Sequence, residues 1–378
     1  MRRLLYVFAV LILLFVLTSC PRTRSEDRPT VLVFDGQSTE LSRTEIVPSF
    51  ESPLPEGRNV IWCATLAMAW NMLAEDVIGE TIVMPDAGEA AELLNNTRVG
   101  EEVIDPETYY ATAGMATGEL IEQIGSEMAD RFPEVTLPAM QPSESFLIYS
   151  YLAVIMNFPN PYEVLEYGMR FTDSAGSRTY VNGFGIGPDD EGADADDIRA
   201  QIGVLFYYHD EEDPESVDEF AVDLWVDSSP YQIVLACFER RESMAATFDH
   251  VMELAGEFPE GEEYRSFHDD DTLKAPDLWW KISHHYEEIE NRPLHNESFA
   301  GHFIADALQN IEFKLDRKGV ILRVETVFLG AGSAGPVPTA RDFIFNRPYL
   351  IYLKKRDADH PVFAMWIDNT ELLAEADY

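Results

Sequence analysis

The sequence feature that most constrains the fold is a long apolar run in the middle of the chain, from Phe146 to Phe158. It reads FLIYSYLAVIMNF and contains several β-branched and aromatic residues, which favour strands. Nearly every position is apolar, so both faces of such a strand are expected to be covered by other parts of the protein. We therefore predict a buried central strand here.

Other strand-like segments outnumber the helical ones and gather in the second half of the chain. Helical regions are predicted at Asn59–Leu73, Pro106–Arg131 and Glu242–Leu254. Further strands are predicted at residues 30–34, 169–172, 178–184, 231–238, 278–282, 311–315, 320–328, 349–353 and 362–367. Because strands follow the first helices instead of alternating with them, the pattern indicates an α+β fold with mostly antiparallel sheets.

The first twenty residues predict an exported chain. Two arginines precede the unbroken apolar run Leu4 to Leu17, which suits a signal peptide and is too short to span a bilayer. The run ends in Leu-Thr-Ser-Cys, which resembles the bacterial lipobox. That resemblance implies removal of residues 1–19, a lipid anchor on Cys20, and a place in the bacterial cell envelope, facing outside the cytoplasm. A plain secretory signal is the alternative. Residues 20–50 are expected to form a tether and N-terminal segment.

The charge of the chain excludes one class of partner. Its 378 residues carry 27 Lys and Arg against 68 Asp and Glu, a formal net charge of −41. A nucleic acid needs basic side chains against its phosphates, so we predict that this protein does not bind one. The range 186–219 holds 13 acidic residues and one basic residue, Arg199. This tract is expected to be a solvated face, with a family-specific insertion as the alternative.

Three groups of residues could carry chemistry. Cys63 lies near the start of a predicted helix, whose N-terminal field would favour a thiolate, but no histidine stands in a distinctive context as its base. A buried structural cysteine is the other interpretation, and a disulfide between Cys63 and Cys237 remains open. His285, with His284 and Glu288 at helical spacing, could chelate a metal. The acidic residues 189–197 could hold Ca²⁺, although the EF-hand spacing is absent.

These groups do not amount to an enzyme. No glycine-rich phosphate loop and no G-x-S-x-G pattern occurs in the sequence. The two metal groups lack a full set of ligands at a recognised spacing. We therefore predict no enzymatic activity, no metal site and no cofactor.

The last part of the chain resembles the end of the serpin family. Residues 306–319, DALQNIEFKLDRKG, are similar to a central-sheet strand that closes in a charged turn and a glycine. Residues 345–349, FNRPY, are similar to the motif by which the family returns into a buried strand, and residues 362–367 fit its closing hairpin. The resemblance extends more weakly over residues 55–373. It implies one serpin-like domain over residues 51–378, with helices packed around three sheets and a long exposed loop near the C-terminus.

The resemblance places a reactive loop at residues 320–342. Inhibitory serpins follow the turn glycine with small residues, which let the cut loop enter the central sheet as a new strand. Here Gly319 is followed by Val-Ile-Leu-Arg-Val-Glu, and this bulk is expected to slow the entry. The candidate loop residues are Gly319, Val320, Leu329, Gly330, Ala331, Gly332, Ser333 and Ala334.

The function implied by the resemblance is that of a surface-tethered protease inhibitor, or of a non-inhibitory descendant. In either case the exposed loop would bind an extracytoplasmic protease or another protein. A lipid-anchored interaction or scaffold protein without a protease target is the first alternative. A thiol hydrolase that uses Cys63 is the second.

Overall fold

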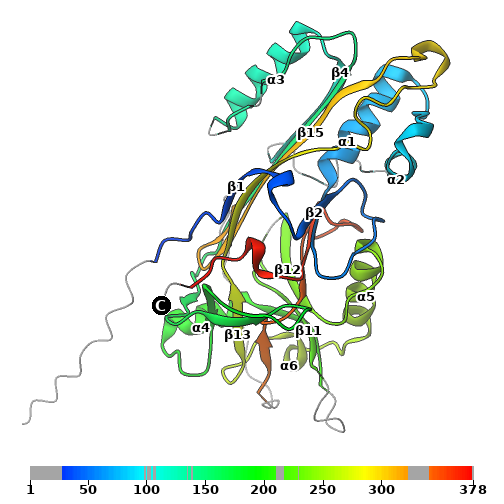
Figure 1. The fold of residues 1–378 in the computed structure, drawn as a ribbon. Coiled ribbons are helices and arrows are strands. Elements are labelled where there is room, and N and C mark those ends of the chain that lie inside the picture. Colours follow the sequence, from blue (N-terminus) through cyan, green and yellow to red (C-terminus); the bar gives the residue numbers. More distant parts are fainter. Residues whose placement is uncertain are drawn as a thin grey trace, which may run out of the picture.

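The computed structural model describes residues 28–97, 99, 104, 108–133, 135–137, 139–209, 217–228, 230–321 and 340–376, apart from the side chains of residues 153–155. Three sheets of four to seven strands and a two-stranded hairpin form its framework (Figure 1). Among the described residues, no helix has both the length and the apolar content needed to cross a membrane. Helices and mixed sheets together make this an α+β protein.

The central sheet has six strands. Its order is β1 (Phe34–Gln37), β14 (Leu278–His285), β15 (Ile304–Asp316), β16 (Gly319–Ile321), β5 (Phe146–Asn157) and β4 (Tyr109–Met115). The apolar run at the centre of the sequence forms β5, so the prediction of a buried central strand is confirmed. β15 also pairs directly with β5, and this pair is parallel.

The second sheet has seven strands and packs across the first. Its order is β10 (Gly203–Tyr208), β11 (Glu219–Asp223), β12 (Tyr231–Cys237), β18 (Tyr349–Lys355), β19 (Phe363–Ile367), β3 (Asn59–Cys63) and β2 (Thr44–Val47). Every pair except β2–β3 is antiparallel. Phe363 of this sheet stacks on Phe313 of the central sheet, with ring centroids 4.8 Å apart. The two sheets therefore share one core.

The third sheet lies at the end of the molecule where β15 finishes. It consists of β17 (Asp342–Ile344), β13 (Thr272–Pro276), β9 (Gly183–Ile186) and β6 (Glu163–Val164). The hairpin consists of β7 (Met169–Thr172) and β8 (Arg178–Val181). β17 is the first strand after the undescribed range 322–339, and it pairs in parallel with β13.

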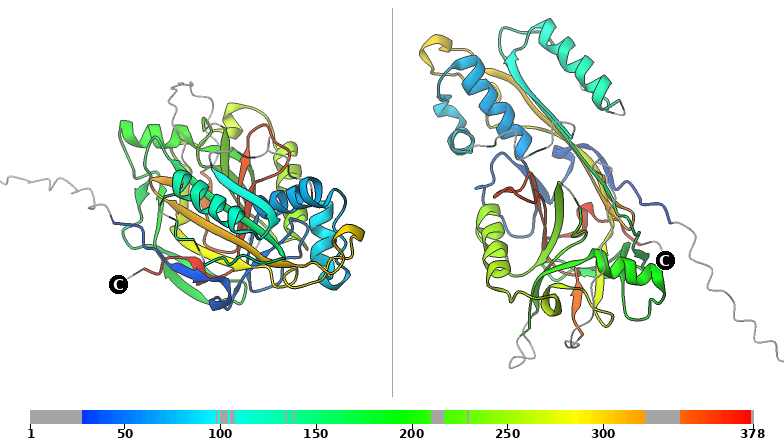
Figure 2. Two further views of the ribbon diagram at one scale, coloured as in Figure 1. Left: turned by 90° about the horizontal axis from the view of Figure 1, so that it is seen from above. Right: turned by 180° about the vertical axis from the view of Figure 1, so that it is seen from behind.

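The helices cover the sheets. They are α1 (Ala64–Met72), α2 (Glu89–Asn96), α3 (Gly118–Arg131), α4 (Ala193–Gln201), α5 (Met244–Glu257) and α6 (Glu262–Arg265). α1 and α3 lie on opposite faces of the long strands of the central sheet (Figure 2). Ile124 and Met128 of α3 are buried against Tyr149 and Leu308 of that sheet. The outer face of β5 and β15 is therefore covered at this level.

Two predicted helices begin as strands. Asn59–Leu73 divides into β3 and α1, because Val60, Ile61 and Trp62 are fully buried between β2 and β19. Pro106–Arg131 divides into β4 and α3, with Thr117 as the N-cap of the helix. The first strand is Phe34–Gln37, later than the predicted range 30–34. β1 and β2 also join the two large sheets, so the body of the fold includes residues before the predicted boundary at residue 51.

Candidate functional site

The turn between β15 and β16 ends in a glycine that has no room for a side chain. Gly319 has a φ of +146°, and a Cβ atom on it would lie 1.7 Å from the carbonyl oxygen of Met156. Asp316 holds the turn before it, accepting a hydrogen bond from the Lys318 backbone N–H at 2.7 Å and pairing with Lys314 at 2.8 Å. This is where the serpin resemblance placed a charged turn and its glycine.

β16 is a short strand that separates two long strands at one end, and we call it the wedge. On one side Val320 pairs with Leu315 of β15, and on the other side it pairs with Met156 of β5. Both pairings are antiparallel, and the Val320 side chain is fully buried on the core side of the sheet. The first residues after the turn already lie in the central sheet as a strand.

Beyond the wedge the central sheet closes. β15 and β5 pair directly with each other, from Phe313 and Val154 to Ile304 and Phe146. We call this parallel β15–β5 pair the seam. Parallel ladders are slightly less stable per residue than antiparallel ones. The seam is thus the place where a further strand could enter the sheet and pair in antiparallel fashion on both sides.

A buried hydrogen-bonded network lies under the middle of the seam. Gln309 of β15 accepts a hydrogen bond from the Tyr286 hydroxyl at 2.7 Å and donates one to Thr65 Oγ1 of α1 at 2.9 Å. Ser150 of β5 is the register partner of Gln309, and its buried hydroxyl has no partner among the described residues. Desolvation raises the pKa of Tyr286 far above its usual value, so this hydroxyl stays a donor. The network links the seam to the helix that supports it.

Sequence reasoning missed this network, although one signal for it is present. Ile311, Phe313 and Leu315 alternate toward the core, and the same alternation carried back along the strand reaches Gln309. A polar residue on an otherwise apolar buried face needs a hydrogen-bond partner. The identity of that partner depends on which helix packs there, and a single strand does not reveal this.

The far end of the undescribed range 322–339 is anchored by a buried ion pair. The Arg341 guanidinium donates to both carboxylate oxygens of Asp271, from Nη2 to Oδ2 at 2.6 Å and from Nε to Oδ1 at 3.2 Å, and its backbone N–H donates to Oδ1 at 2.9 Å. It also donates to the carbonyl oxygens of Tyr264 and Ser266, at 2.8 and 2.6 Å. The chain then passes through residues 342–348 into β18, which forms a hairpin with β19. The return into a buried strand and the closing hairpin are confirmed.

Several predicted residues lie outside the part of the chain that is described. These are the lipidation site Cys20 and the loop residues Leu329, Gly330, Ala331, Gly332, Ser333 and Ala334. Of the candidate loop residues, Gly319 and Val320 are described, and both lie in β16. The two ends of the loop thus enter different sheets, Ile321 the central sheet and Asp342 the third.

The two inner cysteines are buried thiols. Cys63 is the N-cap of α1 and its Sγ lies 3.3 Å from Thr65 Oγ1. Burial raises the pKa of Cys63 to about 11 and that of Cys237 to about 12, and both cysteines are free. The two cysteines form no disulfide, and the interpretation of Cys63 as a buried structural cysteine agrees with the structure, because desolvation opposes a thiolate more than the helix favours it. A thiol hydrolase is therefore not supported.

The helix on which His284 and Glu288 could have chelated a metal is not formed. His284 and His285 end strand β14, so they point to opposite faces of the sheet. His284 is half-buried, its Nδ1 lies 2.7 Å from Ser38 Oγ, and desolvation lowers its pKa to about 4. His285 instead lies 2.9 Å from Glu290. The two histidines are thus separated instead of being joined on one helix face.

The acidic tract contains regular structure in its described part. Residues 193–201 form α4, and the buried Arg199 donates to the carbonyl oxygens of Gly187 and Asp190, both at 2.8 Å. The apolar island within the tract forms β10 at the edge of the seven-stranded sheet. Most acidic side chains of residues 189–197 are exposed. The described part of the tract is therefore a solvated face on a folded support.

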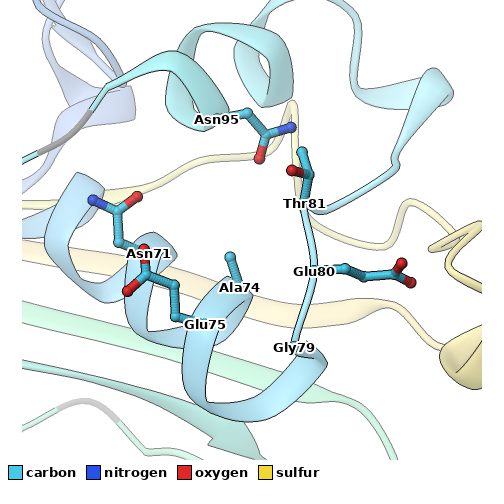
Figure 3. A pocket seen from close by; sticks show the side chains of 7 residues that line it. All are labelled: Asn71, Ala74, Glu75, Gly79, Glu80, Thr81 and Asn95. Carbon is cyan, nitrogen blue, oxygen red and sulfur yellow. The ribbon is translucent and has the colours of Figure 1, made fainter.

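A polar pocket of about 300 Å³ lies beside the end of α1 (Figure 3). Its lining is Asn71, Ala74, Glu75, Gly79, Glu80, Thr81 and Asn95. The amide of Asn95 is used within the fold, since it accepts from Trp70 Nε1 at 3.0 Å and donates to the Ile82 carbonyl oxygen at 2.8 Å. Glu80 likewise accepts from Asn296 at 3.0 Å. These polar groups hold the chain around the pocket together.

Comparisons with known proteins return only solved structures of low sequence identity. No protein-family model matches the sequence, and no curated protein matches it. Among solved structures, protease nexin-1 with heparin is similar at 8% identity and a TM-score of 0.48, over 82% of this chain and 92% of that one. The thermophilic serpin tengpin in its native state is similar at 11% identity and a TM-score of 0.47, over 88% of this chain and 99% of tengpin. Thyroxine-binding globulin with thyroxine is similar at 10% identity and a TM-score of 0.41, over 66% of this chain and 64% of the globulin.

The likeness in fold rests on the chain's own topology more than on these superpositions. The central strand ends in a charged turn and a glycine, and the next residues enter the central sheet. The chain returns through residues 345–349 into a buried strand and closes with a hairpin. Three sheets surrounded by helices complete the arrangement. This chain therefore has an α+β, serpin-like fold.

Proposed function

We propose that the protein is a lipid-anchored, serpin-like protein of the bacterial cell envelope that binds an extracytoplasmic protease through residues 320–342. The observation that carries the proposal is the wedge β16, which holds the head of that segment between β15 and β5. A segment that begins as a strand at the head of a parallel seam can continue into the seam once its far end is released. Cleavage by a protease would release it.

If the chain continued past β16 in the same register, each later residue would have defined neighbours on β15 and β5. Val320 pairs with Leu315 and Met156, so each step forward along the loop moves one residue back on both neighbours. Continued in this way, Leu322 reaches the level of Phe313, Val324 that of Ile311, and Phe328 that of Ala307. All three core-side neighbours are buried. The apolar loop residues at even positions match an apolar core.

The polar loop residues match polar neighbours in the same register. Thr326 reaches the level of Gln309 and Ser150, where the buried hydroxyl of Ser150 has no described partner. On the outer face Arg323 reaches the level of Glu312, a carboxylate that already pairs with Lys281 at 3.2 Å. An inserted strand would replace one parallel ladder by two antiparallel ones. The register thus supports insertion, while the bulk of Leu322 and Val324 is expected to keep it slow.

The length of the seam sets a bound on the bond that is cut. In the continued register, residue 330 reaches Phe146, where β5 begins. A cut before this point would leave part of the seam unfilled. We therefore expect cleavage between Gly330 and Arg341, in the part of the loop that is rich in glycine and alanine.

Incubation with a panel of serine and cysteine proteases tests the binding role. We expect one protease of small-residue preference to cut within residues 330–341, as mapped by mass spectrometry. An SDS-stable complex together with loss of protease activity would show that the protein is an inhibitor. Slow cleavage without such a complex would show that it is a non-inhibitory binder. If no protease cuts or binds within this range, the proposal fails and a scaffold role is favoured.

The anchor is tested separately. Cys20→Ser is expected to move the protein from the membrane fraction to the soluble fraction of the envelope, because a lipidated cysteine is lost. The wild-type protein should carry acyl groups on Cys20 by mass spectrometry. A wild-type chain found soluble and unmodified would contradict the anchor and leave a plain secretory signal.

A further inference from the structure

A histidine and two carboxylates lie close together at the start of β15, the end of that strand farthest from the turn at Gly319. His285 is the last residue of β14, Glu290 lies in the turn that follows, and Asp306 lies near the start of β15. Their ligand atoms all lie within 4.8 Å of one another, and all three side chains are half-buried. Residues distant in sequence thus bring three possible metal ligands to one point.

The backbone fixes this arrangement. The Tyr286 N–H donates to the Ala307 carbonyl oxygen at 3.0 Å, and the Asn291 N–H donates to that of Ile304 at 2.8 Å. The turn that carries Glu290 is therefore tied to β15 on both sides of Asp306. Glu290 Oε1 accepts from the Ala307 N–H at 2.8 Å and lies 2.9 Å from His285 Nδ1. A prearranged ligand set of this kind loses little freedom when an ion binds.

The charge at this point is unbalanced. Two carboxylates lie close together, and within the described ranges neither forms an ion pair with a lysine or arginine. The Asp306 carboxylate accepts no hydrogen bond from the described side chains and backbone groups. Like charges at short range repel, and a divalent cation between them relieves the repulsion.

The donor atoms select the kind of cation. Ca²⁺ and Mg²⁺ are bound by oxygen ligands, whereas an imidazole nitrogen with two carboxylates suits Zn²⁺ and its neighbours in the transition series. We propose that His285, Glu290 and Asp306 bind a divalent transition-metal ion of the Zn²⁺ class, with water in the remaining positions. At metal–ligand distances of about 2.0–2.2 Å the donor atoms of a tetrahedral site lie about 3.5 Å apart. His285 Nδ1 and Glu290 Oε1, which lie 2.9 Å apart, would therefore separate slightly when the ion binds.

The ion would join the end of β14 to the start of β15. Since β15 forms one side of the seam, the ion would stabilise the end of the central sheet that lies farthest along the strand from Gly319. This inference does not depend on a protease target. Of the three residues that could chelate a metal according to the sequence, the proposed site contains only His285, and Glu290 and Asp306 take the places of His284 and Glu288.

Calorimetric titration of the untagged, chelator-treated protein with ZnCl₂ tests the proposal. We expect one ion per chain, a rise in melting temperature on adding ZnCl₂, and at least a tenfold loss of affinity in His285→Ala. Asp306→Asn keeps the shape of the side chain and is expected to weaken binding in the same direction. Circular dichroism confirms that each variant is folded.

His209→Ala is the matched control. His209 Nδ1 lies 2.7 Å from Asp218 Oδ1, so it removes a similar histidine–carboxylate pair, but that pair belongs to no three-ligand group among the described residues. Its Zn²⁺ affinity should equal that of the wild-type protein. Failure of the wild-type protein to bind Zn²⁺, or equal affinities in His285→Ala, Asp306→Asn and wild type, would overturn the proposal.

Discussion

The two large sheets of this protein bury their strands in different ways. In the seven-stranded sheet, β19 is apolar and buried at all five positions and has an antiparallel partner on each side, β18 and β3. In the central sheet, β15 has a parallel partner over the seam, and it buries Gln309 and Asn310. The centre of the seven-stranded sheet is antiparallel throughout, whereas the central sheet has a parallel and therefore weaker pair of strands at its centre.

The difference indicates which sheet could take up another strand. On the proposed function, a strand would enter between β15 and β5 and leave the pairings of β19 unchanged. The wedge β16 already separates these strands at one end. The following predictions test this contrast, from the largest expected effect to the smallest.

Phe363→Ala probes the closed sheet. The ring stacks on Phe313 and lies 6.3 Å from the Trp280 ring, so the substitution leaves a cavity between the two sheets. We expect a loss of about 3–5 kcal/mol in the free energy of unfolding, measured with denaturant. A loss below about 1 kcal/mol would show that the seven-stranded sheet is not the stable part of the fold.

Gly319→Ala probes the wedge. The new Cβ would lie 1.7 Å from the Met156 carbonyl oxygen at a φ of +146°, so β16 must leave its place or the backbone must strain. We expect a loss of about 2–3 kcal/mol. Gly57→Ala is the control, since Gly57 has a φ of +78° with nothing within 4 Å, and should cost about 1 kcal/mol. Equal losses in the two variants would contradict the tight fit of the wedge.

Gln309→Leu probes the network under the seam. The change leaves the Tyr286 hydroxyl and Thr65 Oγ1 without their partner in a buried place, which should cost about 1–3 kcal/mol. Thr65→Val combined with Gln309→Leu should cost less than the sum of the single changes, because the two residues share one hydrogen bond. Strict additivity would show that the network does not act as a unit.

Asp277, whose charge neighbour is Asp316 of the β15–β16 turn, should make the free energy of unfolding depend on pH. Burial, and then the neighbouring charge of Asp316, raise the pKa of Asp277 to about 7. The folded state therefore retains a proton that the unfolded chain gives up near pH 4, so the free energy of unfolding falls as the pH rises from about 4 to about 7. Asp277→Asn should reduce this fall by about 1–2 kcal/mol. An unchanged pH profile in the variant would contradict the raised pKa.

Local pattern predicts part of the fold, since the apolar run 146–158 by itself indicates a buried central strand. The charged turn before Gly319 follows only from the serpin resemblance. Asn59–Leu73 was misread, since its first residues satisfy helix and strand patterns equally and only the pairing with β2 and β19 decides between them.

The site was predictable only in outline. Gly319 was recognised from its place after the turn, but the reason that it must be glycine is the Met156 carbonyl of another strand. The meeting of Gln309 with Thr65 and of Arg341 with Asp271 depends on contacts across the fold. The i, i+4 spacing of His284 and Glu288 suggests a helix, whereas the register of β14 with β15 makes both histidines part of a strand.

The most direct test of the central claim is the melting temperature of the protein before and after a single cut within residues 330–341. Insertion would bury Leu322, Val324 and Phe328, so the account predicts a rise of about 10 °C or more. Thr326→Arg, which sets a charge at the level of Gln309, should be cut without this rise. Thr326→Val, which has nearly the same size and carries no charge, should keep it. An unchanged or lowered melting temperature of the cut wild-type protein would contradict the account.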